Sequence, residues 1–204
     1  MAAIDYYLFG ASPFAYIGHK LFHEITARHG LEINYKLIDL MAVWANSGSV
    51  PVGQRSPLRQ RYRRIELQRL AAYRGLPLNV DPKHFPVDAR LSDLCAIAIA
   101  HSGGDPRDYL WQGHRCVWAE GGDLGDSETI GRMLANAGHD ADRILALART
   151  DEIAAIRERN TADAIAADAV GAPVYVYKGE PFWGQDRLEQ LEQMIVSGRE
   201  PYTA

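Results

Sequence analysis

The first 40 residues of the chain contain three stretches whose apolar residues follow different spacings. Residues 4–10 form a short apolar run rich in β-branched and aromatic side chains, which predicts a buried strand. Apolar residues recur at helical spacing over residues 14–25, and Ser12 and Pro13 ahead of them are favoured at a helix start. Over residues 31–40 apolar and polar residues alternate, as in a strand with one buried face. The chain is therefore predicted to begin with a βαβ unit.

The middle of the chain has a helical pattern throughout. From about residue 55 to residue 160, apolar residues recur at helical spacing, and clusters of glycine and proline separate one run from the next. The clearest runs cover residues 65–73, 91–101, 127–137 and 141–149. No part of this stretch has the alternation that is typical of a strand, so we expect helices only.

Strand patterns return near the C-terminus. Residues 174–177 are β-branched or aromatic, residues 178–180 are typical of a tight turn, and residues 181–183 are expected to form the returning strand of a hairpin. A last helix is predicted over residues 184–196. A βαβ unit and a ββα unit on either side of a helical block make up the topology of thioredoxin with an insertion.

These patterns predict an α/β protein with a thioredoxin-like fold and an all-helical insertion. Residues 1–50 and 161–204 are expected to form the thioredoxin-like domain, and residues 51–160 are expected to form the inserted helical domain. The chain has 204 residues, of which 47% are hydrophobic, and this is sufficient for a folded core.

Composition and charge exclude several classes of protein. A net charge of −4 argues against general nucleic-acid binding, which requires a basic surface. No apolar run reaches the roughly 18 residues that indicate a membrane-spanning helix, and the first residues lack the basic region of a signal peptide. Cys95 and Cys116 lie in predicted helices, where we expect buried thiols, with a disulfide as the less favoured alternative. These features favour a cytoplasmic protein.

The start of the first predicted helix is where a thioredoxin-like fold places its reactive group. Unpaired backbone N–H groups and the helix dipole favour an anion there, including a thiolate. Redox members carry a Cys-x-x-Cys motif at this position, but here residues 12–15 are Ser, Pro, Phe and Ala, which excludes thiol–disulfide exchange at this site. The hydroxyl of Ser12 can instead donate to a thiolate that another molecule brings, and glutathione is the expected carrier. The alternative is that Ser12 only caps the helix.

Two further segments are candidates for contacts with glutathione. Pro173 precedes a predicted strand, and in thioredoxin-like folds this proline is cis, which leaves the backbone of Ala172 free to pair with an extended peptide. An ordinary edge-strand proline is the alternative. Gln185 and Asp186 lie at the start of the last predicted helix, where N–H groups suit a carboxylate and the Asp side chain suits an ammonium. The γ-glutamyl end of glutathione carries both groups, whereas an isolated Asp here would be a helix cap.

A run of seven arginines lies between residues 55 and 74, and only Glu66 opposes them within that segment. A solvated helical face explains such a run. A nucleic-acid patch would need more aromatic residues than Tyr62 and Tyr73. The run by itself does not indicate which of these arginines binds a ligand.

The remaining aromatic residues and the histidines indicate no further site. Trp44, Trp111 and Phe182 are expected in the core, where aromatic residues are most often found. The spacing of His19, His23 and His101 is not that of metal ligands, so no metal is predicted.

Five segments of the chain resemble the signature segments of one enzyme family and follow one another in the same order. They are residues 12–16 (Ser-Pro-Phe-Ala-Tyr), 118–124, 160–164, 171–174 (Gly-Ala-Pro-Val) and 182–188 (Phe-Trp-Gly-Gln-Asp-Arg-Leu). On these segments the chain resembles the glutathione-dependent 2-hydroxychromene-2-carboxylate isomerases, which belong with the kappa-class glutathione transferases and have a DsbA-like thioredoxin fold. The resemblance covers nearly the whole chain.

The resemblance implies a homodimer, glutathione as the cofactor and Ser12 as the catalytic residue. The implied glutathione site consists of Ser12, Phe14, Ser49, Arg59, Ala172, Pro173, Gln185 and Asp186. Two of these depart from the family pattern, because Ser49 lies where the family commonly has an asparagine that contacts glutathione, and Arg59 lies where it has a lysine. Arginine also pairs with carboxylates, in a geometry that differs from that of lysine. Because this segment follows the loop that faces the active site in the family, the resemblance favours Arg59, with Arg63 as the second candidate, as the group that holds an anionic substrate.

The family reaction is the cis–trans isomerisation of an anionic aromatic enone acid. Its substrate, 2-hydroxychromene-2-carboxylate, interconverts with trans-o-hydroxybenzylidenepyruvate when a thiolate adds to the conjugated double bond, the bond rotates and the thiolate leaves. The resemblance therefore implies an isomerase that regenerates glutathione in each cycle. The alternatives are a kappa-class-like glutathione transferase that acts on other electrophiles, and a glutathione- or protein-binding module that has lost catalysis.

Overall fold

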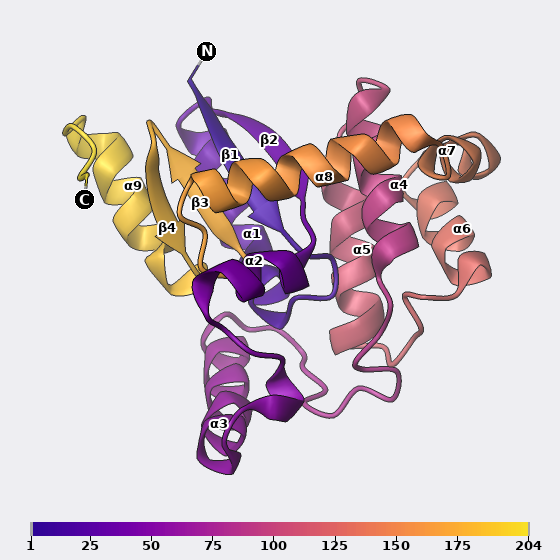
Figure 1. Ribbon diagram of the computed structural model, residues 1–204, viewed down its shortest axis with the longest axis horizontal. Coiled ribbons are helices and arrows are strands. Elements are labelled where there is room, and N and C mark those ends of the chain that lie inside the picture. The colour runs from indigo at the N-terminus through magenta and orange to yellow at the C-terminus, as the bar shows by residue number, and fades with distance from the viewer. Residues whose placement is uncertain (1, 204) are drawn as a thin grey trace.

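A four-stranded mixed sheet lies at the centre of the computed structural model, which describes residues 2–203 (Figure 1). Its strands are β1 (Ala3–Leu8), β2 (Glu32–Leu37), β3 (Val174–Tyr177) and β4 (Glu180–Trp183), in the order β2-β1-β3-β4. β2 runs parallel to β1, whereas β3 pairs antiparallel with β1 and β4 pairs antiparallel with β3. Segments from both ends of the chain build one sheet, and the predicted α/β thioredoxin-like fold is confirmed.

Helix α1 (Pro13–Arg28) begins and ends where local signals predict. Ser12 is its N-cap residue, and the side chain accepts a hydrogen bond from the Ala15 N–H at 3.2 Å. Gly30 follows the helix with a φ of +62°, a left-handed conformation that glycine adopts readily. The N–H of Leu31 then donates back into the last turn of the helix. The chain reverses there into β2, which completes the predicted βαβ unit.

Alternate residues of β1 face two separate layers of the core. Ile4, Tyr6 and Leu8 pack in one cluster with side chains of α1 and of α9 (Leu188–Ser197). Tyr7 faces the other side, in a smaller cluster with side chains of α2 (Leu40–Ser47) and α8 (Asp151–Ala166). Helices therefore cover both faces of the sheet.

Helices alone fill the stretch between the two halves of the sheet. They are α3 (Pro57–Tyr73), α4 (Arg90–His101), α5 (Arg107–Trp118), α6 (Ser127–Asn136), α7 (Ala141–Ala148) and α8, and the described residues from 55 to 160 include no strand. α5 packs against α1, and α4 packs against β2. Figure 1 shows α3 projecting from the body of the molecule and α8 running across the sheet to the helical block. The division into two domains stays a prediction, and its end residues 1 and 204 lie outside the described part of the chain.

The second strand and the short helical segments near it and near the last helix differ from what the sequence patterns predict. The second strand ends at Leu37, and residues 40–47 form α2, for which no helix is expected. Asp39 caps α2 by accepting hydrogen bonds from two N–H groups of its first turn, at 3.0 and 3.3 Å. With eight residues the helix is too short to show a helical period. The last helix begins with a 3-10 turn, η2 (Gln185–Arg187), before α9, and another such turn, η1 (Val52–Gln54), precedes α3.

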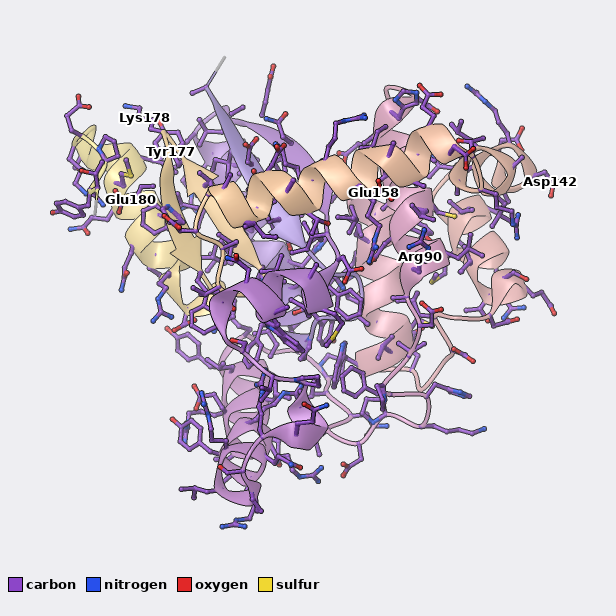
Figure 2. All side chains as sticks on the ribbon, in the orientation of Figure 1. Arg90, Asp142, Glu158, Tyr177, Lys178 and Glu180 are labelled. Atoms are coloured by element: carbon purple, nitrogen blue, oxygen red, sulfur yellow. The ribbon has the colours of Figure 1, made fainter. Side chains whose placement is uncertain are left out.

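The β3–β4 hairpin and the two cysteines follow the prediction. Lys178 and Gly179 have positive φ angles of 51° and 87°, as a two-residue turn between twisted strands requires. In Figure 2, Tyr177, Lys178 and Glu180 lie together at the tip of this hairpin. Cys95 and Cys116 are both buried and free, so the disulfide alternative is excluded.

Candidate active site

Ser12 lies where the start of α1 meets the loop before β3. Its Oγ accepts a hydrogen bond from the Ala15 N–H at 3.2 Å and donates one to the Ala172 carbonyl at 3.4 Å. The Ala172–Pro173 peptide bond is cis, as predicted. Two segments that are 160 residues apart in the sequence therefore meet at one hydroxyl group.

A cavity of about 410 Å³ opens beside Ser12. Six of the eight residues predicted for the glutathione site line it: Ser12, Phe14, Ser49, Arg59, Ala172 and Asp186. They come from the start of α1, the loop after α2, the first turn of α3, and the loops before β3 and after β4. The tertiary structure therefore brings most of the predicted site together around one space.

Pro173 and Gln185 do not line this cavity, although residues next to them in the chain do. The Pro173 carbonyl accepts a hydrogen bond from the Gly184 N–H at 2.9 Å, which ties the loop before β3 to the turn after β4. Gln185 is fully buried, and its Oε1 accepts a hydrogen bond from Nε of Arg74 at 3.4 Å. Both residues therefore support the wall of the cavity from behind.

Asp186 reaches the cavity because Gly184 turns the chain toward it. Gly184 has a φ of +92°, a backbone conformation in which a larger residue would be strained. The Asp186 carboxylate forms an ion pair with Arg187, which also lines the cavity. A cationic group of a ligand would compete with Arg187 for this carboxylate.

The wall that α3 contributes carries the cations Arg59 and Arg63, and also Glu66, whose carboxylate is paired with Arg69. The guanidinium carbon of Arg63 lies over the rings of Phe85 and Trp118, at 5.8 and 5.9 Å from their centroids. Burial, and then the neighbouring cations Arg55 and Arg64, lowers the pKa of Arg63 to about 10. No acidic side chain within residues 2–203 pairs with it. This arrangement is suited to an anion attached to an aromatic ring.

Arg55, Arg59 and Trp44 extend the same wall. Arg59 is exposed, whereas Arg55 lies over the Trp44 ring at 5.1 Å and donates a hydrogen bond to the Val50 carbonyl at 3.0 Å. The expectation that Trp44 belongs to the core is wrong, because it lies on α2, the helix that sequence patterns missed, and lines the cavity. Phe85 also lines the cavity, and no sequence signal indicates it.

A second cavity among the described residues lies away from the predicted site residues. This larger cavity, of about 820 Å³, lies along the outer edge of β2, and none of the predicted site residues lines it. Among residues 2–203, no group of histidine, cysteine and carboxylate side chains is arranged to hold a metal ion. No helix in that range is long and apolar enough to cross a membrane. The cavity beside Ser12 is therefore the candidate active site.

Comparison with protein families agrees with the fold and its sheet topology. A family model, the DsbA-like thioredoxin domain, matches residues 3–196. The chain belongs to the DsbA-like thioredoxin family. Within this DsbA-like family, the chain has Ser12 at the helix start and no cysteine in that turn.

Relatives of this DsbA-like chain carry the name that the sequence segments indicate. The chain is 25% identical over 195 residues to a 2-hydroxychromene-2-carboxylate isomerase from Sphingobium xenophagum, and the match covers 95% of this chain and 97% of that protein. A solved structure of a 2-hydroxychromene-2-carboxylate isomerase matches with a TM-score of 0.78 at 25% identity, over 96% of this chain and 95% of that one. The family resemblance is thereby confirmed over almost the whole chain. The cytosolic disulfide reductase DsbM from Pseudomonas aeruginosa, in a structure with GSH, shares the fold, with a TM-score of 0.68 at 14% identity over 96% of each chain.

Proposed function

We propose that this DsbA-like protein is a glutathione-dependent cis–trans isomerase of aromatic enone acids of the 2-hydroxychromene-2-carboxylate type. The observation that carries the proposal is the place of Ser12, a hydroxyl at the N-terminus of α1 that contacts the Ala172 carbonyl and lines a cavity with a basic aromatic wall. Relatives that are named as isomerases support the reaction. A neighbour of the same fold whose structure is described with GSH supports the cofactor.

The residues around the cavity fit glutathione. A volume of about 410 Å³ is in the range of small-molecule sites. The Ser12 hydroxyl can turn from its 3.4 Å bond with the Ala172 carbonyl to donate to a thiolate, which also frees the Ala172 backbone for a cysteinyl unit. Asp186 offers a carboxylate to the γ-glutamyl ammonium. The proposed glutathione site also includes Phe14, Ser49 and Arg59, whereas Pro173 and Gln185 lie behind its wall and support it.

The residues of the chain stabilise a thiolate and orient the substrate. Bound glutathione supplies the thiolate, which adds to the conjugated double bond, allows rotation about the resulting single bond and leaves again unchanged. Ser12 and the N–H groups at the start of α1 lower the pKa of a thiol held there. Arg63 and Arg59 hold the substrate carboxylate, and the Phe85 ring beside Arg63 offers the substrate an apolar surface.

We also propose that the protein acts in the cytoplasm as a homodimer. Both cysteines are free and buried, which fits a compartment where glutathione keeps thiols reduced. The homodimer rests on the resemblance to the isomerase family alone.

The proposal predicts turnover of 2-hydroxychromene-2-carboxylate only when glutathione is present. Ser12→Ala should lower the rate about ten- to a hundredfold where the thiol is partly protonated, because one donor to a thiolate contributes about 1.5–3 kcal/mol. Thr150→Ala is the matched control, because Thr150 caps α8 by accepting a hydrogen bond from the Ile153 N–H and does not line the cavity. The measurement is the absorbance change of the substrate with and without glutathione.

Three other results of these measurements would each assign a different role to Ser12 or to the protein. Normal turnover by Ser12→Ala, with unchanged titration of the glutathione thiol, would mean that Ser12 only caps α1. Consumption of glutathione with accumulation of a conjugate would make the protein a glutathione transferase for other electrophiles. Binding of glutathione without any turnover would make it a binding module.

A further inference from the structure

The loop that leads into Ser12 is held by three buried side chains of the helical block. The Gly10 N–H donates a hydrogen bond to Oδ1 of Asp93 at 2.9 Å, and the Gly10 carbonyl accepts one from Nδ1 of His114 at 2.9 Å. The Ala11 carbonyl accepts a third hydrogen bond from Nε1 of Trp118 at 3.2 Å. Asp93 lies on α4, whereas His114 and Trp118 lie on α5, the adjacent helix in Figure 1.

The fit between this loop and the three side chains is close. Asp93 is 1% exposed, and His114 and Trp118 are fully buried. A Cβ on residue 10 would lie 2.5 Å from Oδ1 of Asp93, so the short contact requires glycine at this position. The loop is itself a tight turn, in which the Ser12 N–H donates to the Phe9 carbonyl at 2.9 Å.

The donor role of His114 follows from its partners. A carbonyl oxygen only accepts, so Nδ1 carries the proton, and Nε2 has no partner among the described residues. Burial lowers the pKa of His114 to about 4, so the ring stays neutral and keeps this tautomer near neutral pH.

We propose that Asp93, His114 and Trp118 are positioning residues that hold the Ser12 hydroxyl at the N-terminus of α1 for thiolate binding. The inference rests on the role of Ser12 given under Proposed function. None of the three side chains lines the cavity, so each acts through the backbone of residues 10–11. The bonds hold the three consecutive peptide groups that lead into Ser12, and thereby fix the position from which its Oγ reaches Ala15 and Ala172.

The test places a thiol at the position of the hydroxyl and measures its pKa. In a Ser12→Cys variant, the ultraviolet absorbance of the thiolate reports the pKa of the introduced thiol without any need for glutathione. The native thiols do not interfere, because burial raises the pKa of Cys95 to about 12 and that of Cys116 to about 11. A correctly held thiol at a helix N-terminus should titrate below the usual value of about 8.5.

Changes at Asp93 and Trp118 are then added to the Ser12→Cys variant. Asp93→Leu removes the acceptor for Gly10 and should raise the pKa of the introduced thiol by about one unit, a tenfold loss of thiolate near neutral pH. Asp93→Asn removes the charge but keeps an oxygen acceptor for Gly10. The pKa of the introduced thiol should therefore stay close to its value in the Ser12→Cys parent. Trp118→Phe removes one donor, keeps an aromatic ring and should raise the pKa in the same direction. Val117→Ala, a buried change on α5 without polar contacts to the loop, should leave it unchanged.

The outcomes separate this inference from the proposed function. If Asp93→Leu and Trp118→Phe lower the melting temperature as Val117→Ala does but leave the pKa of the introduced thiol unchanged, the three residues are structural only. An ordinary pKa in the Ser12→Cys parent would also overturn the inference. If Asp93→Leu fails to fold, Trp118→Phe decides the question. If the unmodified protein shows no isomerase activity, the proposed function is overturned. The pKa of the introduced thiol would still show whether the three residues position the side chain of residue 12.

Discussion

The arginines between residues 55 and 74 have different surroundings, although they are equivalent in the sequence pattern. Three of them form ion pairs: Arg64 with Asp81, Arg69 with Glu66 and Arg74 with Glu189. Arg63 instead lies over two aromatic rings and has no acidic partner in the described part of the chain. A half-buried cation without a counter-charge is unfavourable unless a ligand supplies the anion. This favours Arg63 over the exposed Arg59 as the main group that binds the substrate carboxylate.

Replacing Arg63 with methionine should raise KM for the anionic substrate about ten- to a hundredfold, because a charge-assisted hydrogen bond contributes about 1.5–3 kcal/mol. Arg59→Met should have a smaller effect, since solvent screens an exposed charge. Arg61→Met, an exposed change on α3 outside the cavity, is the matched control. The measurement is KM and kcat at saturating glutathione, with melting curves alongside. A larger rise in KM for Arg59→Met than for Arg63→Met would contradict the assignment.

At the scale of elements, a cluster of three histidines lies where α1 packs against α5. The ring centroid of His19 lies 4.2 Å from that of His23 and 5.5 Å from that of His114. Burial lowers the pKa of His23 and His114 to about 4 and holds that of His19 well below its usual value. Nε2 of His23 lies 2.7 Å from the Tyr35 hydroxyl, which fits a neutral ring. The two helices therefore pack together around uncharged imidazoles.

Stability should fall as the pH drops from about 6.5 to about 4. The folded pKa values of these histidines lie below the unfolded value of about 6.5, so the folded state binds fewer protons, and the stability they contribute is present above that pH and lost below it. For His23 and His114 the shift corresponds to on the order of 3 kcal/mol each. Asp93 has the opposite effect on stability, because burial raises its pKa to about 7. Its contribution to the free energy of unfolding falls as the pH rises from about 4 to about 7.

The variant His19→Phe tests the cluster, because it removes one of the three titrating rings while it keeps an aromatic side chain. Urea unfolding across this pH range should show a smaller loss of unfolding free energy in acid for His19→Phe than for the unmodified protein. Phe22→Leu, a buried change on α1 that removes no titrating group, is the control and should keep the original pH dependence. If the unfolding free energy of His19→Phe falls with decreasing pH as steeply as that of the unmodified protein, His19 does not contribute to the pH dependence of stability.

At the scale of the whole molecule, contacts cross between the sheet and the helical block at several places. α8 packs against α2 and β2 and also against α4 and α7, and α1 packs against α5. The hydrogen bonds from Asp93, His114 and Trp118 to the loop before Ser12 add polar links. We therefore expect the two predicted domains to unfold together, because neither can lose its structure without exposing apolar surface of the other.

This expectation predicts one cooperative transition in chemical denaturation. Circular dichroism and tryptophan fluorescence should give coincident curves. Both parts of the chain contribute to the fluorescence, because Trp44 and Trp183 flank the cavity on the sheet side and Trp118 lies on α5. Two separated transitions would show instead that residues 51–160 form an independently stable domain.

Local signals explain which parts of this structure could be predicted from the sequence. The start of α1, the turn between β3 and β4 and the glycine after α1 depend on capping, on left-handed residues and on strand spacing, which act within a few positions. The cis bond at Pro173 followed from the topology that these elements imply. Sequence patterns do not predict helix α2 because eight mostly apolar residues carry no period. The core placement of Trp44 rests on the usual burial of aromatic residues, which says nothing of the cavity beside α2.

The sequence by itself determined the topology, the position of Ser12 at a helix start and the absence of a cysteine pair there. These features depend on hydrophobic periodicity and turn residues, which are set by amino acids close together in the chain. Only the tertiary structure decided that Arg63 faces the cavity without a partner, and that Asp93, His114 and Trp118 hold the loop before Ser12. Those contacts join residues that are 83 to 107 positions apart in the chain. Which distant side chains meet depends on how whole elements pack, and no local pattern encodes that choice.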